Sequence, residues 1–301
     1  MPRLRDRAPY LAYRAAAAVG RGLPFPLARA TADTASLLAS RAMPGRRAMV
    51  ARHLRRVRPE LEGLALERAV AESFASYGRY WLDSFRLPGT PADVIDARMS
   101  HVGVDHLDDA LALGKGVILA VPHLGGWDFG GAWLAAVGRP PTAVVEPVEP
   151  PELFAWFVGL REALGMRIVP LGPRSATEVL RTLRAGGIVL LVSDRDLGGH
   201  GVEVELFGER TTLPGGPATL ALRSGAPLMA AAVFLGRTGR HDGVILRPID
   251  TSRGGGPLRD DVARVTQDLA HDLEKLIRMA PEQWHLFQPN WPSDRAGPRG
   301  G

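Results

Sequence analysis

The stretch GVILAVPHLGGWD at residues 116–128 decides the expected fold of this chain. It begins as an apolar, partly β-branched run that is interrupted at Pro122. Two glycines then precede a second apolar segment. This pattern predicts a buried strand, a tight turn and a helix. His123 then lies at the carboxyl end of the strand and Asp128 in the first helical turn. We expect Asp128 to accept a hydrogen bond from one imidazole nitrogen, so that the other can take a proton from a substrate hydroxyl.

The same spacing also fits a structural role for both residues. The chain holds eight histidines, and a histidine followed five positions later by an aspartate arises readily by chance. In that interpretation His123 is a hydrogen-bonded turn residue, and Asp128 is a carboxylate favoured by the helix N-terminus. The surrounding sequence must decide between the two.

Strand patterns alternate with helical patterns along most of the chain. The expected strands beyond 116–121 are 142–145, 167–170, 187–192, 201–206, 228–235 and 243–247. The expected helices are 64–85, 106–113, 127–137, 151–164, 175–185, 216–224 and 260–280. Such alternation is typical of right-handed crossovers between parallel strands. We predict an α/β fold with a mostly parallel central sheet flanked by helices, as a single domain over residues 1–301 with a disordered tail at 292–301.

Polar residues follow several of these strands at their carboxyl ends, where open α/β sheets bind ligands. Glu146 follows one strand, and the run SDRD at 193–196 follows another. Strict alternation in 201–206 places Glu203 and Glu205 together on the face opposite the apolar residues. One or both of these carboxylates are expected to reach the site beside His123.

The amino-terminal region, residues 1–60, is basic and amphipathic. Residues 1–58 hold 13 arginines against two aspartates, a net charge of +11, whereas the whole chain carries +5. Leucines and alanines between residues 11 and 41 are interleaved with these arginines, a pattern that predicts helices lying on an anionic membrane surface. The alternative is a helical hairpin packed on the catalytic domain with solvated arginines. Nucleic acid is not an expected partner, because interleaved aromatics and a recognisable motif are missing.

Several function classes are excluded by what the sequence lacks. Without cysteine there is no disulfide, thiolate metal site or cysteine nucleophile. No apolar run is long enough to span a bilayer, and no signal core precedes a cleavage site. Serine-hydrolase, nucleotide-binding and zinc-protease motifs are also missing, so we expect neither a metal nor a cofactor.

Further motifs accompany the His123-x4-Asp128 spacing. They are SDRD at 193–196, PGGPA at 214–218, GAP at 225–227 and PEQWH at 281–285. With them the chain resembles the bacterial lysophospholipid acyltransferase superfamily, in its lipid A late-acyltransferase branch. Val145-Glu146, PELF at 151–154 and WHLFQPNW at 284–291 are similar to the actinobacterial phosphatidylinositol mannoside acyltransferases.

This resemblance implies an acyl-CoA-dependent acyltransferase that moves a long-chain fatty acyl group to a mannose hydroxyl of a phosphatidylinositol mannoside. An alcohol attacks a carbonyl carbon efficiently only when a base removes its proton. Because the attacked thioester expels a thiolate directly, the transfer requires no acyl-enzyme. Acyl-CoA is then a co-substrate, a glycolipid is the acceptor, and an anionic membrane is a partner. The implied location is the cytoplasmic face of the inner membrane, as a peripheral protein.

The resemblance also implies roles for individual residues. His123 is the base, Asp128 its partner, and Glu203 a third catalytic carboxylate, with Glu205 as the alternative. Glu146 is a candidate contact for sugar hydroxyls, the alternative being a solvated carboxylate at a strand end.

Two arginines are candidates for phosphate or oxyanion contact, because guanidinium groups form paired hydrogen bonds with such anions. They are Arg161 and Arg195. For each, the alternative is a salt bridge to a neighbouring carboxylate such as Asp194 or Asp196.

Three rival functions stay open. The same chemistry can serve another glycolipid or a lysophospholipid. A metal-dependent phosphoesterase would use the histidine and carboxylates as ligands, and a non-catalytic lipid-binding protein would use the basic surface alone.

Overall fold

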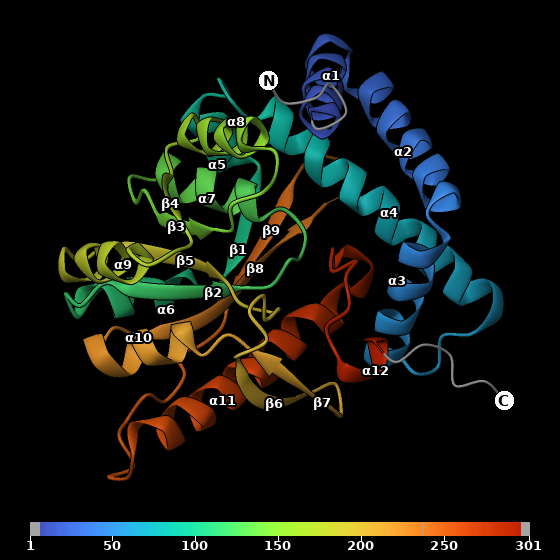
Figure 1. Ribbon diagram of the computed structural model, residues 1–301. Helices are drawn as coiled ribbons and strands as arrows, with labels where there is room; N and C mark the ends of the chain where they lie inside the picture. Colours follow the sequence, from blue (N-terminus) through green and yellow to red (C-terminus); the bar gives the residue numbers. More distant parts are fainter. Residues whose placement is uncertain (1–6, 237, 296–301) are drawn as a thin grey trace, which may run out of the picture.

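The computed structural model describes residues 7–236 and 238–295 (Figure 1). Its first part is a layer of helices: α1 (Ala8–Gly22), α2 (Phe25–Ala42), α3 (Pro44–Val57) and α4 (Gly63–Arg86). α1 and α2 are separate because Pro24 holds the preceding Leu23 in an extended conformation. The long helix α4 contacts the other three. None of the helices described is both long and apolar enough to cross a membrane.

A seven-stranded sheet lies beside this helical layer, in the order β1-β9-β8-β2-β5-β3-β4. Its strands are β1 (Met99–Val102), β2 (Val117–Val121), β3 (Thr142–Val145), β4 (Arg167–Pro170), β5 (Ile188–Val192), β8 (Leu228–Leu235) and β9 (His241–Ile245). All neighbours are parallel except β8 and β9. The predicted α/β fold with a mostly parallel sheet flanked by helices is confirmed; β1 was not among the expected strands.

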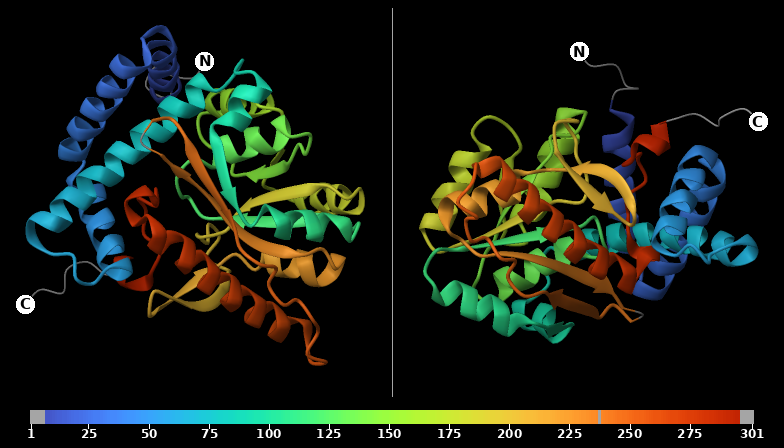
Figure 2. Two further views of the ribbon diagram at one scale, coloured as in Figure 1. Left: turned by 180° about the vertical axis from the view of Figure 1, so that it is seen from behind. Right: turned by 90° about the horizontal axis from the view of Figure 1, so that it is seen from below.

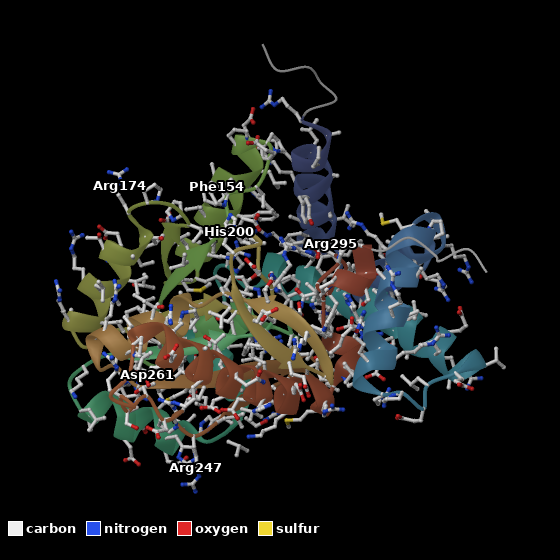
Figure 3. All side chains as sticks on the ribbon, turned by 60° about the horizontal axis from the view of Figure 1, so that its bottom comes forward. Phe154, Arg174, His200, Arg247, Asp261 and Arg295 are labelled. Atoms are coloured by element: carbon white, nitrogen blue, oxygen red, sulfur yellow. The ribbon has the colours of Figure 1, made fainter. Side chains whose placement is uncertain are left out.

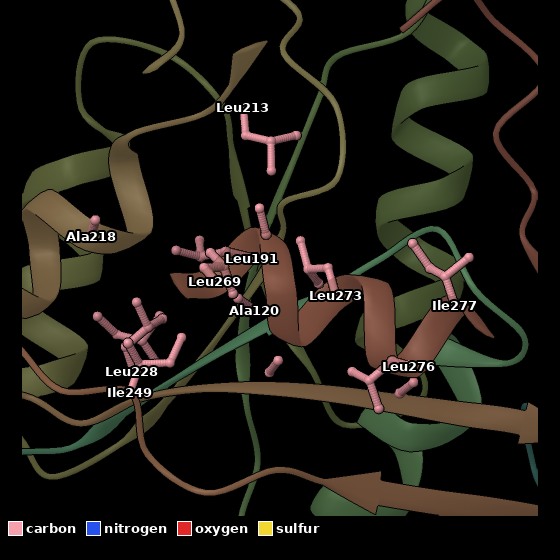
Figure 4. Packing of buried hydrophobic residues seen from close by; sticks show 14 of the residues in the cluster. Ala120, Leu191, Leu213, Ala218, Leu228, Ile249, Leu269, Leu273, Leu276 and Ile277 are labelled. Atoms are coloured by element: carbon pink, nitrogen blue, oxygen red, sulfur yellow. The ribbon is translucent and has the colours of Figure 1, made fainter. Parts of the chain in front are cut away.

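Helices cover both faces of the sheet. The first face carries α5 (Ala92–Ala97), α6 (Val104–Ala112), α7 (Trp127–Ala136) and α8 (Pro151–Glu162), and the second carries α9 (Ser175–Arg184), α10 (Gly216–Ser224) and α11 (Leu258–Met279). Successive side chains of β2 point to opposite faces of the sheet. Leu119 faces α7, whereas Ala120 packs with Leu269 and Leu273 of α11 (Figure 4). Both faces are apolar, which explains the unbroken apolar run of β2.

The strand expected at 201–206 does not join the central sheet. It forms β6 (Val202–Leu206), which pairs in antiparallel fashion with β7 (Glu209–Leu213) in a separate hairpin packed on α11. Two residues, Phe207 and Gly208, both at positive φ, make its turn. The parallel crossover expected for this segment is therefore wrong, because a two-residue connection allows only an antiparallel partner.

The carboxyl-terminal segment returns to the helical layer through the 3₁₀ helix η1 (Pro281–Gln283) and the short helix α12 (Pro292–Arg295), which lies beside α3 (Figure 2). Asp294 is buried there, with His53 Nε2 at 3.2 Å and Arg56 Nη1 at 2.9 Å. The tail expected to be disordered, 292–301, begins with this short helix. Its remainder, 296–301, lies outside the described residues.

Candidate active site

His123 and Asp194 meet at the carboxyl edge of the sheet. β2 and β5 pair in register with Val121 opposite Val192, so the residue two positions beyond each strand lies beside its counterpart. His123 Nδ1 lies 2.7 Å from Asp194 Oδ1, and the His123 backbone N–H donates to Asp194 Oδ2 at 3.0 Å. The strand pairing thus produces a histidine held by a carboxylate.

Asp194 is fully buried yet well supplied with donors. The indole N–H of Trp284 donates to Oδ2 at 2.7 Å, and the Asn290 side chain donates to the Asp194 carbonyl at 3.1 Å. Burial by itself raises the pKa of the carboxyl group, but the charge and hydrogen bonds of His123 and the Trp284 hydrogen bond outweigh it and lower this pKa. Asp194 is therefore ionised and can stabilise a protonated imidazole.

The second nitrogen of His123, Nε2, is available for proton transfer. The side chain is 39% exposed, and no described residue makes a hydrogen bond to Nε2. The backbone around it is fixed: His285 N–H donates to the His123 carbonyl at 2.7 Å, and Gly125 N–H donates to the Gln283 carbonyl at 2.9 Å. Gly125 has φ +58°, and a Cβ there would collide with the Val233 carbonyl, so only glycine fits.

His285 lies next to His123, is partly buried and packs among aromatic rings of α4. Its Nε2 lies 2.9 Å from the Ser76 hydroxyl. Burial, followed by the proximity of His123, lowers the pKa of His285 to about 3. His285 is therefore neutral, and it supports the turn without competing for the proton.

Asp128 does not pair with His123, so the predicted partnership is wrong. Its buried carboxylate accepts hydrogen bonds from the Tyr80 hydroxyl at 2.7 Å and the Ser84 hydroxyl at 3.0 Å. Arg161 Nε donates to the other oxygen at 2.8 Å. The first turn of α7 aims Asp128 at α4 and α8, whereas Asp194 already occupies His123 Nδ1. Asp128 thus ties three helices together beneath the site.

Arg161 is accordingly buried instead of facing a ligand. Its guanidinium lies over the rings of Trp127 at 4.5 Å and Phe157 at 5.6 Å, besides its ion pair with Asp128. The alternative of a salt bridge therefore describes Arg161, although its partner is Asp128 instead of Asp194 or Asp196.

Glu146 and Arg195 do lie at the carboxyl edge, because β3 and β5 are neighbours. Arg195 Nη2 and Glu146 Oε2 are 3.4 Å apart, with the Glu146 side chain 48% exposed. The structure therefore brings two of the predicted binding residues together as a solvent-facing pair, one strand away from His123.

Glu203 and Glu205 project from the exposed face of β6, as the alternation predicted. Neither carboxylate makes a hydrogen bond or ion pair with any residue that the structure describes, whereas the backbone N–H of Glu205 bonds to Gln267. Neither, therefore, holds His123 in this structure. The carboxylate that does so, Asp194, follows β5 directly.

A narrow apolar cavity lies between the central sheet and α7. Val121 and Leu124, which flank the Pro122-His123 turn, line it together with Trp127, Gly130 and residues of β8 and β9. Almost all of its walls are hydrocarbon, so it suits an aliphatic chain better than a sugar. Two of its lining residues, Val121 and Leu124, are thus close neighbours of His123 in the sequence.

Sequence patterns missed two members of the site, Asp194 and Trp284. Asp194 was recognised as a polar residue at a strand end, but only the β2–β5 pairing shows that it lies opposite His123. Trp284 lies in the PEQWH motif, but the motif alone does not show that its indole meets Asp194. Among the described residues no group of three or more histidines and carboxylates is arranged to hold a metal ion.

Comparison with known proteins identifies the family. The profile of the bacterial lipid A biosynthesis acyltransferases matches residues 6–293. The phosphatidylinositol mannoside acyltransferase of Mycobacterium tuberculosis H37Rv is 41% identical over 228 residues, which is 74% of this chain and 70% of that protein. The enzyme of the same name from Mycolicibacterium smegmatis is 38% identical over 234 residues, 76% of this chain and 74% of that protein.

A more distant relative is the lipid A biosynthesis acyltransferase of Haemophilus influenzae, 26% identical over 194 residues, which cover 63% of this chain and 58% of that protein. The family profile covers nearly the whole chain, including the turn of His123 and the segment of Trp284. The chain therefore belongs to the bacterial lipid A biosynthesis acyltransferase family.

Proposed function

We propose that this protein transfers a long-chain fatty acyl group from acyl-CoA to a mannose hydroxyl of a phosphatidylinositol mannoside. The observation that carries the proposal is the His123 imidazole, bound at Nδ1 by a buried, ionised Asp194 and free at Nε2 beside an apolar cavity. The similarity to mycobacterial phosphatidylinositol mannoside acyltransferases supports the choice of acceptor.

The chemistry follows from the two nitrogens of His123. Nε2 takes the proton of the acceptor hydroxyl while its oxygen attacks the thioester carbonyl, forming a tetrahedral intermediate. Asp194 stabilises the resulting imidazolium through Nδ1. The intermediate collapses by breaking the carbon–sulfur bond, and the imidazolium returns its proton to the departing CoA thiolate. An ester is formed, and no covalent acyl-enzyme is needed.

The apolar cavity holds the fatty chain in this proposal. Leu124, the residue that follows His123, is part of its lining, so we propose that a chain held there carries its carbonyl carbon near the base. The polar head of the donor and the sugar of the acceptor then lie at the carboxyl edge. In this proposal Glu146 and Arg195, which lie together at that edge, contact sugar hydroxyls or phosphate.

The acceptor can be identified by its product. Purified protein is incubated with palmitoyl-CoA and a panel of phosphatidylinositol mannosides, another glycolipid and a lysophospholipid, and the products are analysed by mass spectrometry. We expect acylation on a mannose ring. Acylation of the lysophospholipid alone would refute this acceptor while leaving the acyl transfer intact.

We also propose that the protein works at an anionic membrane surface, on its cytoplasmic face. α1 and α2 expose five large apolar side chains on the outside of the helical layer, among the arginines of this region. They are Leu11, Val19, Leu27, Leu37 and Leu38. Arginine alone does not mark this face, because Arg174 and Arg247 also project at other edges of the molecule (Figure 3). Exposed leucines beside arginines are the combination that suits a lipid interface.

The central test measures CoA release and glycolipid acylation by the His123→Ala and Asp194→Asn variants. Both are expected to lose transfer while keeping the wild-type unfolding temperature. Wild-type rates in both variants would refute the mechanism. His271→Ala, on the exposed side of α11, is the control for a histidine substitution.

A further inference from the structure

The carboxyl-terminal segment, residues 281–295, binds Asp194 at two points. Trp284 donates its indole N–H to Oδ2 at 2.7 Å, and the side-chain amide of Asn290 donates to the backbone carbonyl at 3.1 Å. The first contact orients the carboxylate that binds His123, and the second fixes the backbone that carries it. We call these two contacts the links. Between η1 and α12, where every residue is described, the segment has neither helix nor strand, so the links depend on whatever else holds it.

Asp294 holds the end of this segment in a closed turn. Its Oδ2 accepts hydrogen bonds from the backbone N–H groups of Asn290 at 3.0 Å and Trp291 at 3.2 Å. The side chain is fully buried, which by itself raises its pKa, but the hydrogen bonds from His53 and from these two N–H groups outweigh burial and lower the pKa. Asp294 is therefore an ionised acceptor that positions the backbone of Asn290 directly.

The helix α3 binds the same carboxylate from the helical layer. His53 Nε2 lies 3.2 Å from Asp294 Oδ2, and Arg56 Nη1 lies 2.9 Å from Oδ1. His53 also donates from Nδ1 to the Leu286 carbonyl at 2.9 Å, and Arg56 Nη2 donates to the Ser293 hydroxyl at 2.7 Å. We call His53, Arg56 and Asp294 the clamp. It joins α3 to a segment that also binds Asp194.

We infer that the clamp positions the proposed base, His123, by keeping both links on Asp194 in place. This inference rests on the proposed function, since it takes His123 as the base. A displacement of about 1 Å at a reacting group can cost a hundredfold in rate, so a loosened segment is enough to slow the chemical step. Every residue that lines the apolar cavity lies outside 281–295, so binding of the acyl chain stays unaffected.

Asp294→Asn tests the clamp. The variant keeps the size of the side chain but replaces one acceptor oxygen with an NH₂ group, which then faces donors of α3 or of the turn. We expect kcat with palmitoyl-CoA and a phosphatidylinositol mannoside to fall by about tenfold to a hundredfold, while KM for palmitoyl-CoA stays within about twofold. A residue with a purely structural role would lower the unfolding temperature without lowering kcat.

Asp261→Asn is the matched control, because it makes the same substitution in a comparable setting. Asp261 is also buried, accepts a backbone hydrogen bond from Gly254 at 2.9 Å and pairs with Arg253 at 2.6 Å. Figure 3 shows Asp261 on the opposite side of the molecule from Arg295, the last residue of α12. We expect Asp261→Asn to lower the unfolding temperature and to keep kcat within about twofold.

A second measurement asks whether Asp294 acts through the links. The double variant Trp284→Phe, Asn290→Ala removes both of them. Adding Asp294→Asn to this background is expected to lower kcat by no more than about a further twofold, because the clamp has nothing left to act through. A further tenfold loss would show that Asp294 acts by another route and would overturn the inference.

The outcomes separate the clamp from the proposed function. Wild-type kcat in Asp294→Asn, with transfer by the wild type intact, would overturn the positioning role. If Asp294→Asn fails to fold, Arg56→Gln, which removes one arm of the clamp, is judged by the same comparison of kcat with KM. Absence of transfer by the wild type to every acceptor would overturn the proposed function instead.

Discussion

Trp284 donates its indole N–H to the carboxylate of Asp194 at 2.7 Å, from a position 90 residues further along the chain. The hydrogen bond reaches Oδ2, which leaves Oδ1 to His123. The indole therefore sets the orientation of the carboxylate that in turn orients the imidazole. It is a positioning residue for the proposed base.

Trp284→Phe is expected to lower kcat by about tenfold to a hundredfold, because a hydrogen bond to a charged group is lost. Losing this donor also raises the pKa of Asp194, so the acid limb of the kcat–pH profile moves to higher pH. The matched control is Trp291→Phe, whose buried indole N–H has no partner among the described residues. Equal profiles in both variants would contradict the positioning role.

Asp194→Asn is expected to reduce kcat by about a thousandfold or more, because an amide neither stabilises the imidazolium nor fixes the same tautomer. Glu203→Gln is the comparison, since its carboxylate has no described partner and lies on the exposed face of β6. We expect it to retain kcat within a few fold. Kinetics with palmitoyl-CoA and a phosphatidylinositol mannoside distinguish the two, and a larger loss in Glu203→Gln would reassign the carboxylate.

Asp128→Asn is expected to destabilise the protein by about 3–5 kcal/mol, because it leaves Arg161 as an uncompensated buried charge. The double variant Asp128→Asn, Arg161→Met removes both charges and should be less destabilised than Asp128→Asn alone. Urea unfolding of both variants and of Arg161→Met measures this coupling. Additive losses would show that the ion pair does not tie α7 to α8.

His285 gives the stability of the protein a dependence on pH. Its pKa is about 3 in the folded state, against 6.5 for an ordinary histidine, so the unfolded chain binds the proton more readily between these values. Stability is therefore lost as pH falls below about 6.5, by at most about 1.4 kcal/mol per pH unit for this group. His285→Gln should flatten this slope in unfolding measurements between about pH 4 and pH 6.5, which lie within the window. An unchanged slope would assign the dependence to other groups.

Leu27→Glu with Leu38→Glu is expected to weaken binding to anionic vesicles by about tenfold or more, because two apolar contacts are replaced by negative charges. Both side chains are more than half exposed on α2, at 57% and 61%. Leu113→Glu is the control: it is 62% exposed at the end of α6, away from the helical layer (Figure 1). Co-sedimentation equal to wild type in the double variant would contradict the proposed membrane face.

The fold was largely predictable because each buried strand carries a short apolar run. The expected helix at 64–85 matches α4, and the run before His123 matches β2. The direction of each strand and its neighbours in the sheet were harder to predict from the sequence. β9 is antiparallel to β8, and the periodicity of side chains along a strand does not reveal the direction of its neighbour.

The site was only half predictable, because the sequence does not reveal which strands are neighbours in the sheet. His123 stands out in the sequence because it ends an apolar strand. Its partner depends on which strand lies beside β2, and this is decided by packing over both faces of the sheet. The nearer Asp128 was the attractive choice, but the first turn of α7 directs it to Arg161. Sequence proximity therefore indicated the wrong carboxylate.

The contacts of the carboxyl-terminal segment with the turn at His123 also set the order of events during translation. The ribosome has made His123 and Asp194 long before it reaches Trp284 and His285, whose backbone and indole hold them in place. A nascent chain stalled before that segment carries both reactive groups without their supports. In the proposed mechanism, catalytic competence therefore follows only after the segment of Trp284 and His285 has been made and has packed against His123 and Asp194.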